Sequence, residues 1–513
     1  MSHTREEILS LLKEAEVAAV ATVAGDKMRT RMMHFAVDDN FRIFVATMKG
    51  DPKTLQMMHH PSLSLLAYFP APEFNQSREI EITGTPVFVQ DAQEREKALQ
   101  ITAKKSPVVK YLMETGNAGL LDCVRVEPRE IKLRVFGEIV QGMPPTVVEF
   151  PENRAMVNEG KLLLSKVKNW YREIRAPFLT AALVPVLLGA AIAFAQTKSL
   201  DWGYFVLTLI AGLLLHAGAN TINDYFDHKS GNDDINREYV RPFSGGSRLI
   251  QLGLLTPMEV LGIAIFCFLV SSLLGLYLAW TRGPLILILG VIGVISAFFY
   301  TGRPFYWAKR GMGELLVGLN FGPLMTLGAY YVQTRTFSWL PVLVAVPVGL
   351  LIAAVLYINE FPDYTADKAV GKRTLVVRLG RRHAVPLYIA MMVLANLAII
   401  AGVALNVLPL AALLALVLIP LSFRAIQNAL AHYQSSYDLA PTNALTITGH
   451  LALGLALTIA YVWIGVERGG VGLAGILGLA FLAFVAYMYW NVERHRKAFH
   501  GLKGVVTGEG GKS

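Results

Sequence analysis

Two clusters of carboxamide and carboxylate side chains share one spacing along this 513-residue sequence. Asn223 and Asp227 lie four residues apart, and Asn359, Asp363 and Asp367 repeat that interval. Residues four apart lie on one face of a helix, and their oxygen atoms are ligands that Mg²⁺ prefers and often shares with substrate phosphates. The sequence therefore predicts a Mg²⁺ site whose ligands are Asn223, Asp224, Asp227, Asn359, Asp363 and Asp367.

Basic side chains accompany both clusters and can bind the phosphate oxygens that a metal leaves free. We predict a catalytic set of Asn223, Asp227, Asp363, Asp367, Lys372 and Arg373. The predicted diphosphate-binding residues are Arg241, Arg248, Tyr300, Lys309 and Arg310. Two simpler interpretations stay open. The acids can solvate helix ends and pair with nearby lysines, and the group around Tyr300 can consist of ordinary loop residues.

The elements that must position these residues are long apolar stretches after residue 176. Hydrophobic residues make up 54% of the chain and charged residues 17%, against roughly 45–50% and 25% in soluble proteins. About 20 apolar residues in a helix cross a bilayer. We predict nine or ten transmembrane helices, over 177–195, 202–222, 260–280, 283–302, 315–334, 337–358, 384–405, 408–423, 445–466 and 470–490.

The distribution of Lys and Arg predicts the orientation of these helices. Most of the basic residues between the spans lie in the loops that also carry the acidic clusters, and such loops face the cytoplasm. We therefore expect a multi-pass protein of the inner (plasma) membrane, with both termini and the active-site loops cytoplasmic. We therefore expect the net charge of +9 to attract anionic lipid rather than nucleic acid. Acids near Met1 and a missing apolar core predict no signal peptide.

Both acidic clusters, with their basic neighbours at 241–248 and 371–375, resemble the two aspartate-rich motifs of UbiA-type intramembrane prenyltransferases. The resemblance covers residues 165–490. The segments 300–304, 313–314 and 320–324 are most similar to the 1,4-dihydroxy-2-naphthoate prenyltransferases of menaquinone synthesis. One departure concerns a third acid that the family often has four residues after Asp227. This chain has Gly231 there, and Asp233 or Asp234 can replace that acid.

The resemblance implies Mg²⁺-dependent transfer of a prenyl group from a polyprenyl diphosphate to an aromatic acceptor, with membrane lipid as surroundings. The expected acceptor is 1,4-dihydroxy-2-naphthoate; 4-hydroxybenzoate, a chlorophyllide-like ring and a glycerol phosphate are alternatives. A secondary transporter is the rival from another class, although transporter sites lie near the bilayer midplane rather than at helix ends. His216 and His450 fall within predicted spans, where we expect them to pack rather than to act.

Residues 1–145 have the pattern of a small α+β domain. Thr4 and Glu7 form a capping box that opens a helix through about Ala15. Strands are predicted at 17–24, 28–37, 41–46, 62–69, 79–89 and 123–140, and helices at 51–59 and 91–104. The alternation in Glu79-Ile80-Glu81-Ile82 indicates one buried face. A small antiparallel barrel is the predicted result.

This order of elements resembles the pyridoxamine 5′-phosphate oxidase-like split barrels, which commonly bind flavin mononucleotide (FMN) as dimers. The resemblance implies cofactor binding by Arg31, Thr47, Lys49 and Lys53, and a homodimer through the barrel. Haem or a deazaflavin are alternative ligands, and a barrel that has lost its cofactor is the simpler interpretation.

The predicted fold class is therefore multi-domain: an N-terminal α+β split β-barrel followed by an all-α polytopic membrane bundle. The predicted domains are 1–145 for the barrel, 146–165 for a linker, 166–495 for the transmembrane prenyltransferase and 496–513 for a cytoplasmic tail. Pro144, Pro145 and Pro151 mark the linker.

Overall fold

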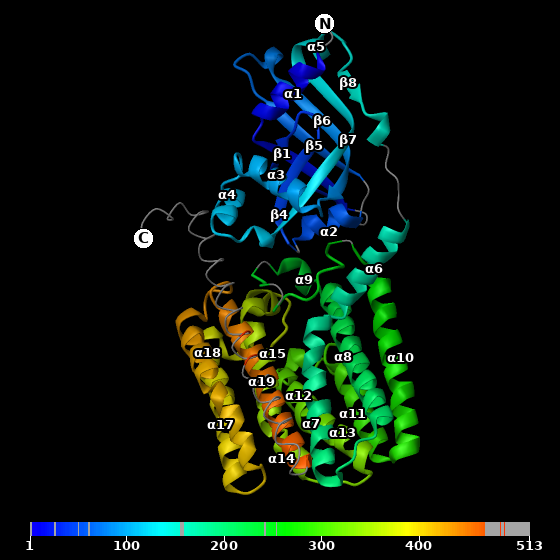
Figure 1. The fold of residues 1–513 in the computed structure, drawn as a ribbon, viewed down its shortest axis with the longest axis vertical. Helices are drawn as coiled ribbons and strands as arrows, with labels where there is room; N and C mark the ends of the chain where they lie inside the picture. Colours follow the sequence, from blue (N-terminus) through cyan, green and yellow to red (C-terminus); the bar gives the residue numbers. More distant parts are fainter. Residues whose placement is uncertain are drawn as a thin grey trace. The chain divides into compact units, whose positions relative to one another are not determined.

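The computed structural model describes residues 3–24, 27–49, 51–59, 62–153, 159–236, 238–240, 243–252 and 254–466, with 483 and 487. The described residues form two compact units (Figure 1). One contains the chain up to Asn169 together with Leu252–Thr256, and the other contains Trp170–Gln251 and the chain from Pro257. The first is built around a sheet and the second from helices.

The first unit is a curled antiparallel sheet with strand order β2-β1-β5-β6-β7-β4-β3, and β8 pairs with β7. The predicted barrel fold class is confirmed by this sheet. The strands are β1 (Val17–Ala24), β2 (Lys27–His34), β3 (Ala36–Val37), β4 (Ile43–Met48), β5 (Leu63–Phe69), β6 (Arg78–Phe88), β7 (Leu121–Val135) and β8 (Thr146–Glu149).

Alternation along the strands separates core from surface. Ile80 and Ile82 are fully buried, while Glu79 and Glu81 on the other face pair with Arg134 of β7 at 3.0 and 2.9 Å. A period of two residues puts successive side chains on opposite faces. One face of β6 therefore packs on the core and the other carries a charged ladder.

Two predicted boundaries in this unit are wrong. The strand predicted over 123–140 ends at Val135, and residues Phe136–Val140 form the short helix α5. Phe136 there packs against Phe74, with ring centroids 4.8 Å apart, so tertiary contact overrides strand propensity. The predicted linker also begins too early, because β8 hydrogen-bonds to β7 over Thr146–Glu149.

Four further helices pack around the sheet: α1 (Arg5–Glu14), α2 (Pro52–His59), α3 (Ala92–Ala103) and α4 (Pro107–Glu114). The predicted cap of α1 is confirmed, because the Thr4 hydroxyl accepts a bond from the Glu7 N–H at 3.2 Å. Helix α4 was not predicted. Its signal is Ser106 before Pro107, a cap residue followed by proline at the first helical position.

The helical unit follows the predicted spans closely. Its helices are the last turn of α6 (Glu159–Glu173), α7 (Thr180–Thr197), α8 (Trp202–Ser230), α9 (Asn232–Ile235), α10 (Pro257–Arg282), α11 (Leu285–Phe299), α12 (Gly313–Leu319), α13 (Met325–Thr334), α14 (Leu340–Val344), α15 (Val346–Ala369), α16 (Leu375–Leu379), α17 (Arg381–Ala404), α18 (Ile419–His432) and α19 (Ala440–Gly465). A π-helical turn at Asn320–Leu324 joins α12 to α13, and a 3₁₀ segment at Leu410–Leu418 leads into α18.

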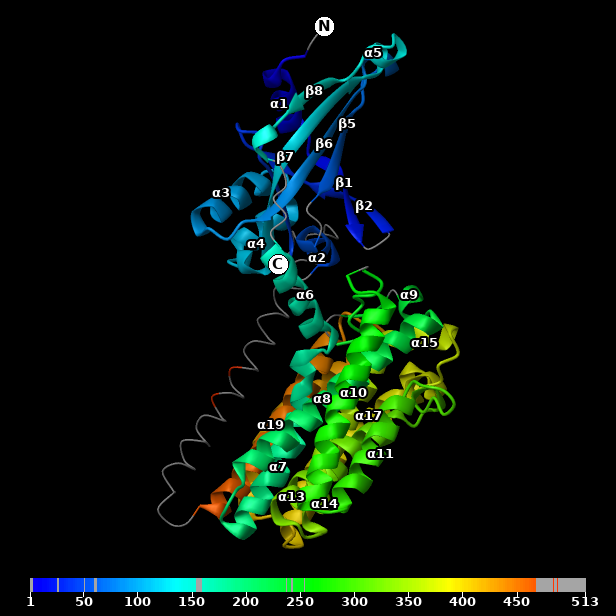
Figure 2. The same cartoon turned by 90° about the vertical axis from the view of Figure 1, so that its right-hand side faces the viewer.

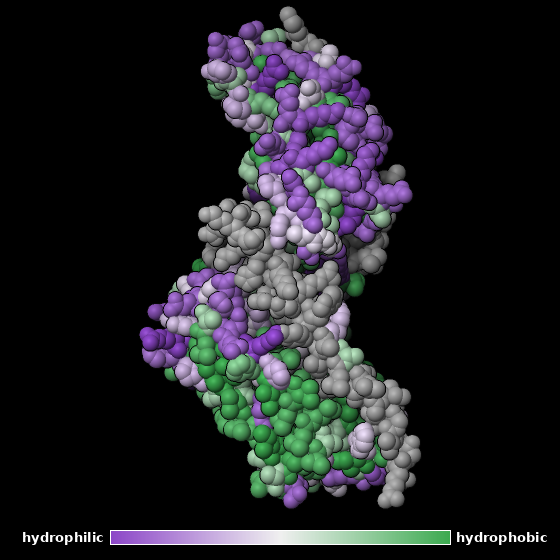
Figure 3. Space-filling model, turned by 60° about the vertical axis from the view of Figure 1, so that its left-hand side comes forward, coloured by the Kyte–Doolittle hydropathy of each residue, from purple (hydrophilic) through white to green (hydrophobic). Residues whose placement is uncertain are grey.

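Eight helices within the described residues are long and apolar enough to cross a membrane. Their exposed faces are apolar, as the band of hydrophobic residues over the helical unit in Figure 3 shows. The predicted polytopic bundle is confirmed, but a count of nine or ten is not. Helix α11, predicted as a full span, has only 15 residues, and the span predicted over 470–490 lies almost wholly outside the described residues.

Small residues allow the helices to approach closely. A Cβ on Gly349 of α15 would lie 2.7 Å from the Gly318 carbonyl oxygen of α12, and one on Gly189 of α7 would clash with the Thr326 carbonyl oxygen of α13. Such contacts replace the hydrophobic effect as the packing force inside a bilayer. Figure 2 shows the neighbouring helices α8 and α10, which pack along much of their length beside α11.

Candidate functional site

The helical unit encloses a cavity of about 610 Å³ lined by α8, α10, α11, α12, the π-helical turn, α13 and α15. Most of the lining is apolar, including Leu289 and Val294 of α11 and Met325 of α13. One end is polar, where Asp227 of α8 and Asp367 of α15 enter the lining. The cavity therefore offers an apolar body to one part of a ligand and charged groups to another.

The first predicted cluster lies at the end of α8. Asn223 and Asp227 line the cavity from one helix face, and the Asn223 Nδ2 donates to Asp227 Oδ2 at 3.3 Å. Helix α8 stops three residues later, because Gly231 adopts φ +76°, a left-handed conformation that favours glycine at helix ends. The cluster thus occupies the last turns of the helix, as predicted.

The second predicted cluster lies on α15 and is held from the loop after α8. Asp363 Oδ1 accepts from Asn236 Nδ2 at 2.7 Å, and Asp367 Oδ1 accepts from Asn232 Nδ2 at 2.9 Å. Asn359 also lines the cavity and accepts from Asn443 Nδ2 at 2.7 Å. Asn232 and Asn236 were not predicted. Their only sequence signal is their four-residue spacing just after the first cluster.

Of the two acids that could replace the missing third acid, only Asp233 belongs to the cavity lining. Asp233 is buried and lines the cavity, whereas Asp234 is exposed. Burial, followed by the negative charges of Asp227 and Asp224, raises the pKa of Asp233 to about 8. The raised pKa favours the neutral, protonated form of Asp233 at neutral pH, because burial and neighbouring negative charges both disfavour a further carboxylate.

Lys372 is the cation that bridges the two clusters. Its Nζ lies 3.2 Å from Asp227 Oδ2 and 3.6 Å from Asp367 Oδ1. Burial alone would lower the pKa of Lys372, but Asp227 and Asp367 outweigh burial and hold it well above the ordinary lysine value. An ammonium group therefore stays in the cavity between the acids of α8 and α15.

Asp224 does not join the other acids. It lies outside the cavity lining, where Arg175 pairs with its Oδ1 and the Ser247 N–H donates to its Oδ2 at 2.8 Å. The helical period explains this, because residue 224 is rotated by about 100° from residue 223 on α8. Asp224 therefore braces the loop around Ser247, and its place among the predicted metal ligands is not supported by the geometry.

Arg175 was missed by the sequence reasoning and lines the cavity. Beside it Glu173 accepts a bond from the Ser247 hydroxyl at 2.6 Å, and burial, followed by the charge of Asp224, raises the pKa of Glu173 to about 8. Position alone gave no signal for Arg175, because it precedes the first span like several other basic residues.

Of the remaining predicted diphosphate-binding and catalytic residues, the cations that the structure describes lie outside the cavity lining. Tyr300 enters the lining, but Arg248 lies over the Tyr239 ring with 4.1 Å between its guanidinium carbon and the ring centroid. Lys309, Arg310 and Arg373 are exposed and lie outside the lining. Arg241 lies outside the described residues.

The side-chain oxygen atoms at the polar end are suitable ligands for Mg²⁺, which binds oxygen in proteins. Asn223 Oδ1 and Asn232 Oδ1 are buried and have no hydrogen-bond partner within the part of the chain that the structure describes. In the same part, no group of three His, Cys, Asp or Glu side chains is close enough to hold a metal. Carboxamide oxygens and phosphate oxygens of a substrate would therefore have to complete the coordination of such an ion.

In the sheet unit, the four predicted cofactor residues divide into two kinds. Arg31 and Thr47 are partly or fully buried, and each has a buried polar atom, Nη1 and Oγ1, without a partner among the described residues. Lys49 is exposed, and Lys53 pairs with Asp51 at 2.8 Å. Two cations at most are therefore available without breaking an ion pair.

Comparison with known proteins gives matches to both units. Residues 182–438 match the model of the UbiA prenyltransferase family. The chain is 28% identical over 301 residues to a 2-carboxy-1,4-naphthoquinone phytyltransferase of Synechocystis, covering 58% of this chain and 94% of that one. It is 33% identical over 300 residues to a 1,4-dihydroxy-2-naphthoate octaprenyltransferase of Mycobacterium tuberculosis, covering 58% and 97%.

Two solved structures align with separate parts of the chain. A digeranylgeranylglyceryl phosphate synthase is 18% identical, covering 58% of this chain and 99% of that one, with a TM-score of 0.41. The FAD binding protein of Mycobacterium smegmatis is 17% identical, covering 26% and 97%, with a TM-score of 0.20. The family match spans half of the chain, and the relatives align over nearly their whole length. The chain therefore belongs to the UbiA prenyltransferase family, as its aspartate-rich motifs predicted.

Proposed function

We propose that this protein transfers a prenyl group from a polyprenyl diphosphate to 1,4-dihydroxy-2-naphthoate, with Mg²⁺, in menaquinone synthesis. The single observation that supports this most is the cavity, whose apolar walls end at two facing acidic clusters bridged by Lys372. The names of its relatives support the choice of acceptor, since several act on naphthoate-type substrates by name.

The roles of the chain's own residues follow from charge. A diphosphate at the polar end would accept bonds from Lys372 and from Arg175, which both line the cavity. Mg²⁺, held there with Asn223, Asp227 and Asp363, would supply charge neutralisation for the leaving diphosphate. Breaking of the C1–O bond leaves an allylic cation and free diphosphate. A carbon of the electron-rich ring attacks the cation and then loses its proton, or its carboxyl group as CO₂ with release of a proton, so that the ring regains aromaticity. The apolar walls keep water away from that cation.

The rival transporter function is disfavoured by where the acids lie. Asp227 is three residues from the end of α8, and Asp367 is two residues from the end of α15. A transporter would place its ion site near the midplane. Helix ends at a membrane surface instead suit a site that receives a charged diphosphate from water.

The test is mass spectrometry of the lipid products. The purified chain, in detergent or nanodiscs with MgCl₂ and a prenyl diphosphate, is offered 1,4-dihydroxy-2-naphthoate, 4-hydroxybenzoate or a glycerol phosphate. We expect a prenylated product with the first acceptor. Prenylation of 4-hydroxybenzoate alone would reassign the acceptor, and no product with any acceptor would contradict the proposed reaction.

The proposed location is the inner membrane, with the ends of α8 and α15 facing the cytoplasm. The basic loops of the helical unit support this orientation through the positive-inside rule. A polyprenyl diphosphate is charged at one end only, so its diphosphate can be bound at that face while its chain stays in the apolar interior. Cysteine labelling, described in the Discussion, tests the orientation directly.

A second, separate proposal is that the sheet unit binds FMN through its phosphate and forms a homodimer. Arg31 supports it, because its Nη2 is fixed by Gln56 Oε1 at 2.7 Å and by Thr22 Oγ1 at 2.9 Å while its Nη1 stays unpartnered among the described residues. Flavin absorbance of the purified full-length chain and of Arg31→Ala tests this. Binding of haem or a deazaflavin instead, or equal binding by the variant, would overturn it.

A further inference from the structure

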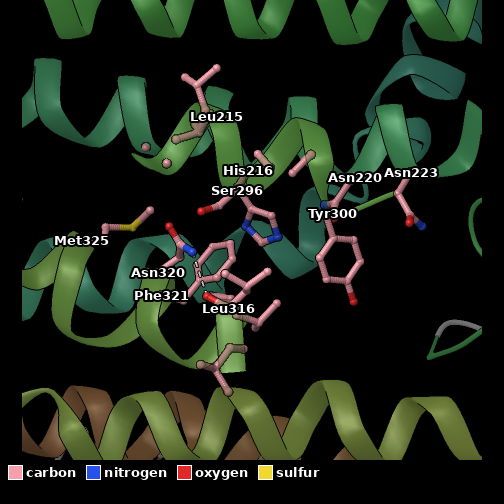
Figure 4. Close-up of a pocket in the computed structure, with 18 of the residues that line it drawn as sticks. Leu215, His216, Asn220, Asn223, Ser296, Tyr300, Leu316, Asn320, Phe321 and Met325 are labelled. Atoms are coloured by element: carbon pink, nitrogen blue, oxygen red, sulfur yellow. Dashed lines mark hydrogen bonds between the residues drawn. The ribbon is translucent and has the colours of Figure 1, made fainter. Parts of the chain in front are cut away.

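The cavity contains polar side chains well away from the acidic clusters. His216 of α8, Ser296 of α11 and Asn320 of the π-helical turn all enter its lining. Figure 4 shows these three side chains gathered beside Phe321, while Tyr300 and Asn223 lie farther along the cavity. We call His216, Ser296 and Asn320 the deep polar layer.

Helical spacing gives the depth of this layer. His216, Asn220, Asn223 and Asp227 line the cavity from one face of α8. At 1.5 Å per residue, His216 lies about 10 Å beyond Asn223 and about 6 Å beyond Asn220 along the helix. Ser296 of α11 precedes Tyr300, the residue that caps this helix, by the same four residues. His216 and Ser296 therefore belong to one polar layer, and Asn220 and Tyr300 form a second layer about one helical turn away along the cavity.

His216, for which the sequence predicts a packing role, also lines the cavity. Its Nδ1 is buried and has no hydrogen-bond partner among the residues that the structure describes. Its ring contacts the Phe321 ring, with centroids 4.6 Å apart and planes at 63°. The residue is only partly buried and lines the cavity, so a polar group of a bound ligand can reach the imidazole there.

The chain also distorts its backbone at this layer. Residues Asn320–Leu324 form a π-helical turn that contains Pro323, between the α-helices α12 and α13. Such turns are frequent at functional sites. Here the turn places Asn320 and Phe321 in the cavity lining beside His216.

We propose that the deep polar layer recognises one ring hydroxyl of a para-dihydroxylated aromatic acceptor, with His216 as its main hydrogen-bonding partner. The ring would lie against Phe321. Its second hydroxyl would face the layer of Asn220 and Tyr300, because para oxygens across one ring are about one helical turn apart. This inference rests on the proposed function and assigns His216 to binding and specificity, not to bond breaking.

The chemistry of the layer excludes two other occupants. A prenyl tail carries no polar atoms and would offer the His216 imidazole no hydrogen bond. A carboxylate needs a cation, but the cavity-lining cations among the described residues are Arg175 and Lys372, and they contact acids at the polar end. The carboxyl of a naphthoate would therefore point to that end, and a hydroxyl is left for His216.

The experiment measures whether each variant of His216 changes the preference between acceptors, as in a double-mutant cycle. The ratio of kcat/KM for 1,4-dihydroxy-2-naphthoate to that for two analogues, each lacking one hydroxyl, is measured for the wild type, His216→Leu and His216→Asn. Intrinsic reactivity cancels when ratios are compared between proteins. For one analogue we expect His216→Leu to lower the ratio about tenfold, and His216→Asn to restore part of it. The KM for the prenyl diphosphate should not change.

Controls separate the possible failures. His432 is exposed at the end of α18, so His432→Leu should keep the wild-type ratio. If His216→Leu fails to fold, Ser296→Ala and His216→Asn provide the same comparison. Unchanged ratios with an active wild type, or a raised KM for the prenyl diphosphate only, would overturn the role of the layer. A wild type that never prenylates 1,4-dihydroxy-2-naphthoate would contradict the proposed function itself.

Discussion

Replacing Lys372 by methionine tests the central electrostatic feature of the cavity. The change keeps most of the side-chain volume and removes the one charge that touches both Asp227 and Asp367. The side chains of these acids are 14% and 2% exposed, so little water can solvate them in place of the ammonium. The two carboxylates would face each other without compensation.

The size of the effect follows from burial. Removing one partner of a buried ion pair costs about 3–5 kcal/mol, because an uncompensated charge remains. We therefore expect the thermal unfolding midpoint of Lys372→Met in detergent to fall by several degrees without divalent ions. The control is Lys368→Met, since Lys368 is exposed one turn away and touches neither acid.

Added Mg²⁺ should then stabilise the variant more than the wild type. In the wild type Lys372 competes with Mg²⁺ for the same carboxylates, and in the variant this competition is gone. A ligand at about 100 times its Kd stabilises the folded state by about 2.7 kcal/mol. MgCl₂ should thus recover much of the lost midpoint in Lys372→Met, and EDTA should remove the recovery.

The activity of Lys372→Met should fall even where Mg²⁺ restores its stability. The diphosphate loses one charge-assisted bond of about 1.5–3 kcal/mol, which corresponds to a rise of about 10- to 150-fold in its KM. The assay is prenyl transfer at varied prenyl diphosphate and saturating Mg²⁺. A variant with wild-type stability, no response to Mg²⁺ and an unchanged KM would refute the placement of Lys372 between the acids.

Three further predictions follow from the same structure. Asp227→Asn should lower prenyl transfer by more than about a hundredfold at fixed Mg²⁺, because losing the charge of a buried ligand costs at least about 3 kcal/mol; wild-type turnover would contradict its role. Cysteines at Ser230 and Ser338 should be labelled from the cytoplasm and from outside respectively, and external labelling of Ser230→Cys would reverse the orientation. Cys123 should resist alkylation, because burial raises its pKa from 9.0 to about 11 and the reactive thiolate is then about a hundredfold rarer at pH 8. Its labelling rate in native and unfolded protein, followed by mass spectrometry, checks this, and equal rates would show an accessible thiol.

Local patterns in the sequence were sufficient for the elements and for the two acidic motifs. Apolar runs of membrane length predicted the spans, and alternation at 79–82 predicted a strand with one buried face. The four-residue interval correctly placed Asn223 with Asp227 and Asp363 with Asp367 along shared helix faces. These features depend on neighbours within one or two turns, so the chain itself encodes them.

Only the tertiary structure decided which partner each of these side chains meets. Asp224 pairs with Arg175 and does not join Asn223 and Asp227 in the cavity. Lys372 lies between the acids of α8 and α15. Asn232 and Asn236 donate hydrogen bonds to the acids of α15. Helical periodicity predicts which side chains share a helix face. It does not predict which residues pack against that face, because the opposing helix is more than a hundred residues away in the sequence. His216 became a candidate binding residue for the same reason: its cavity exists only where α8, α11 and the turn at Asn320 come together.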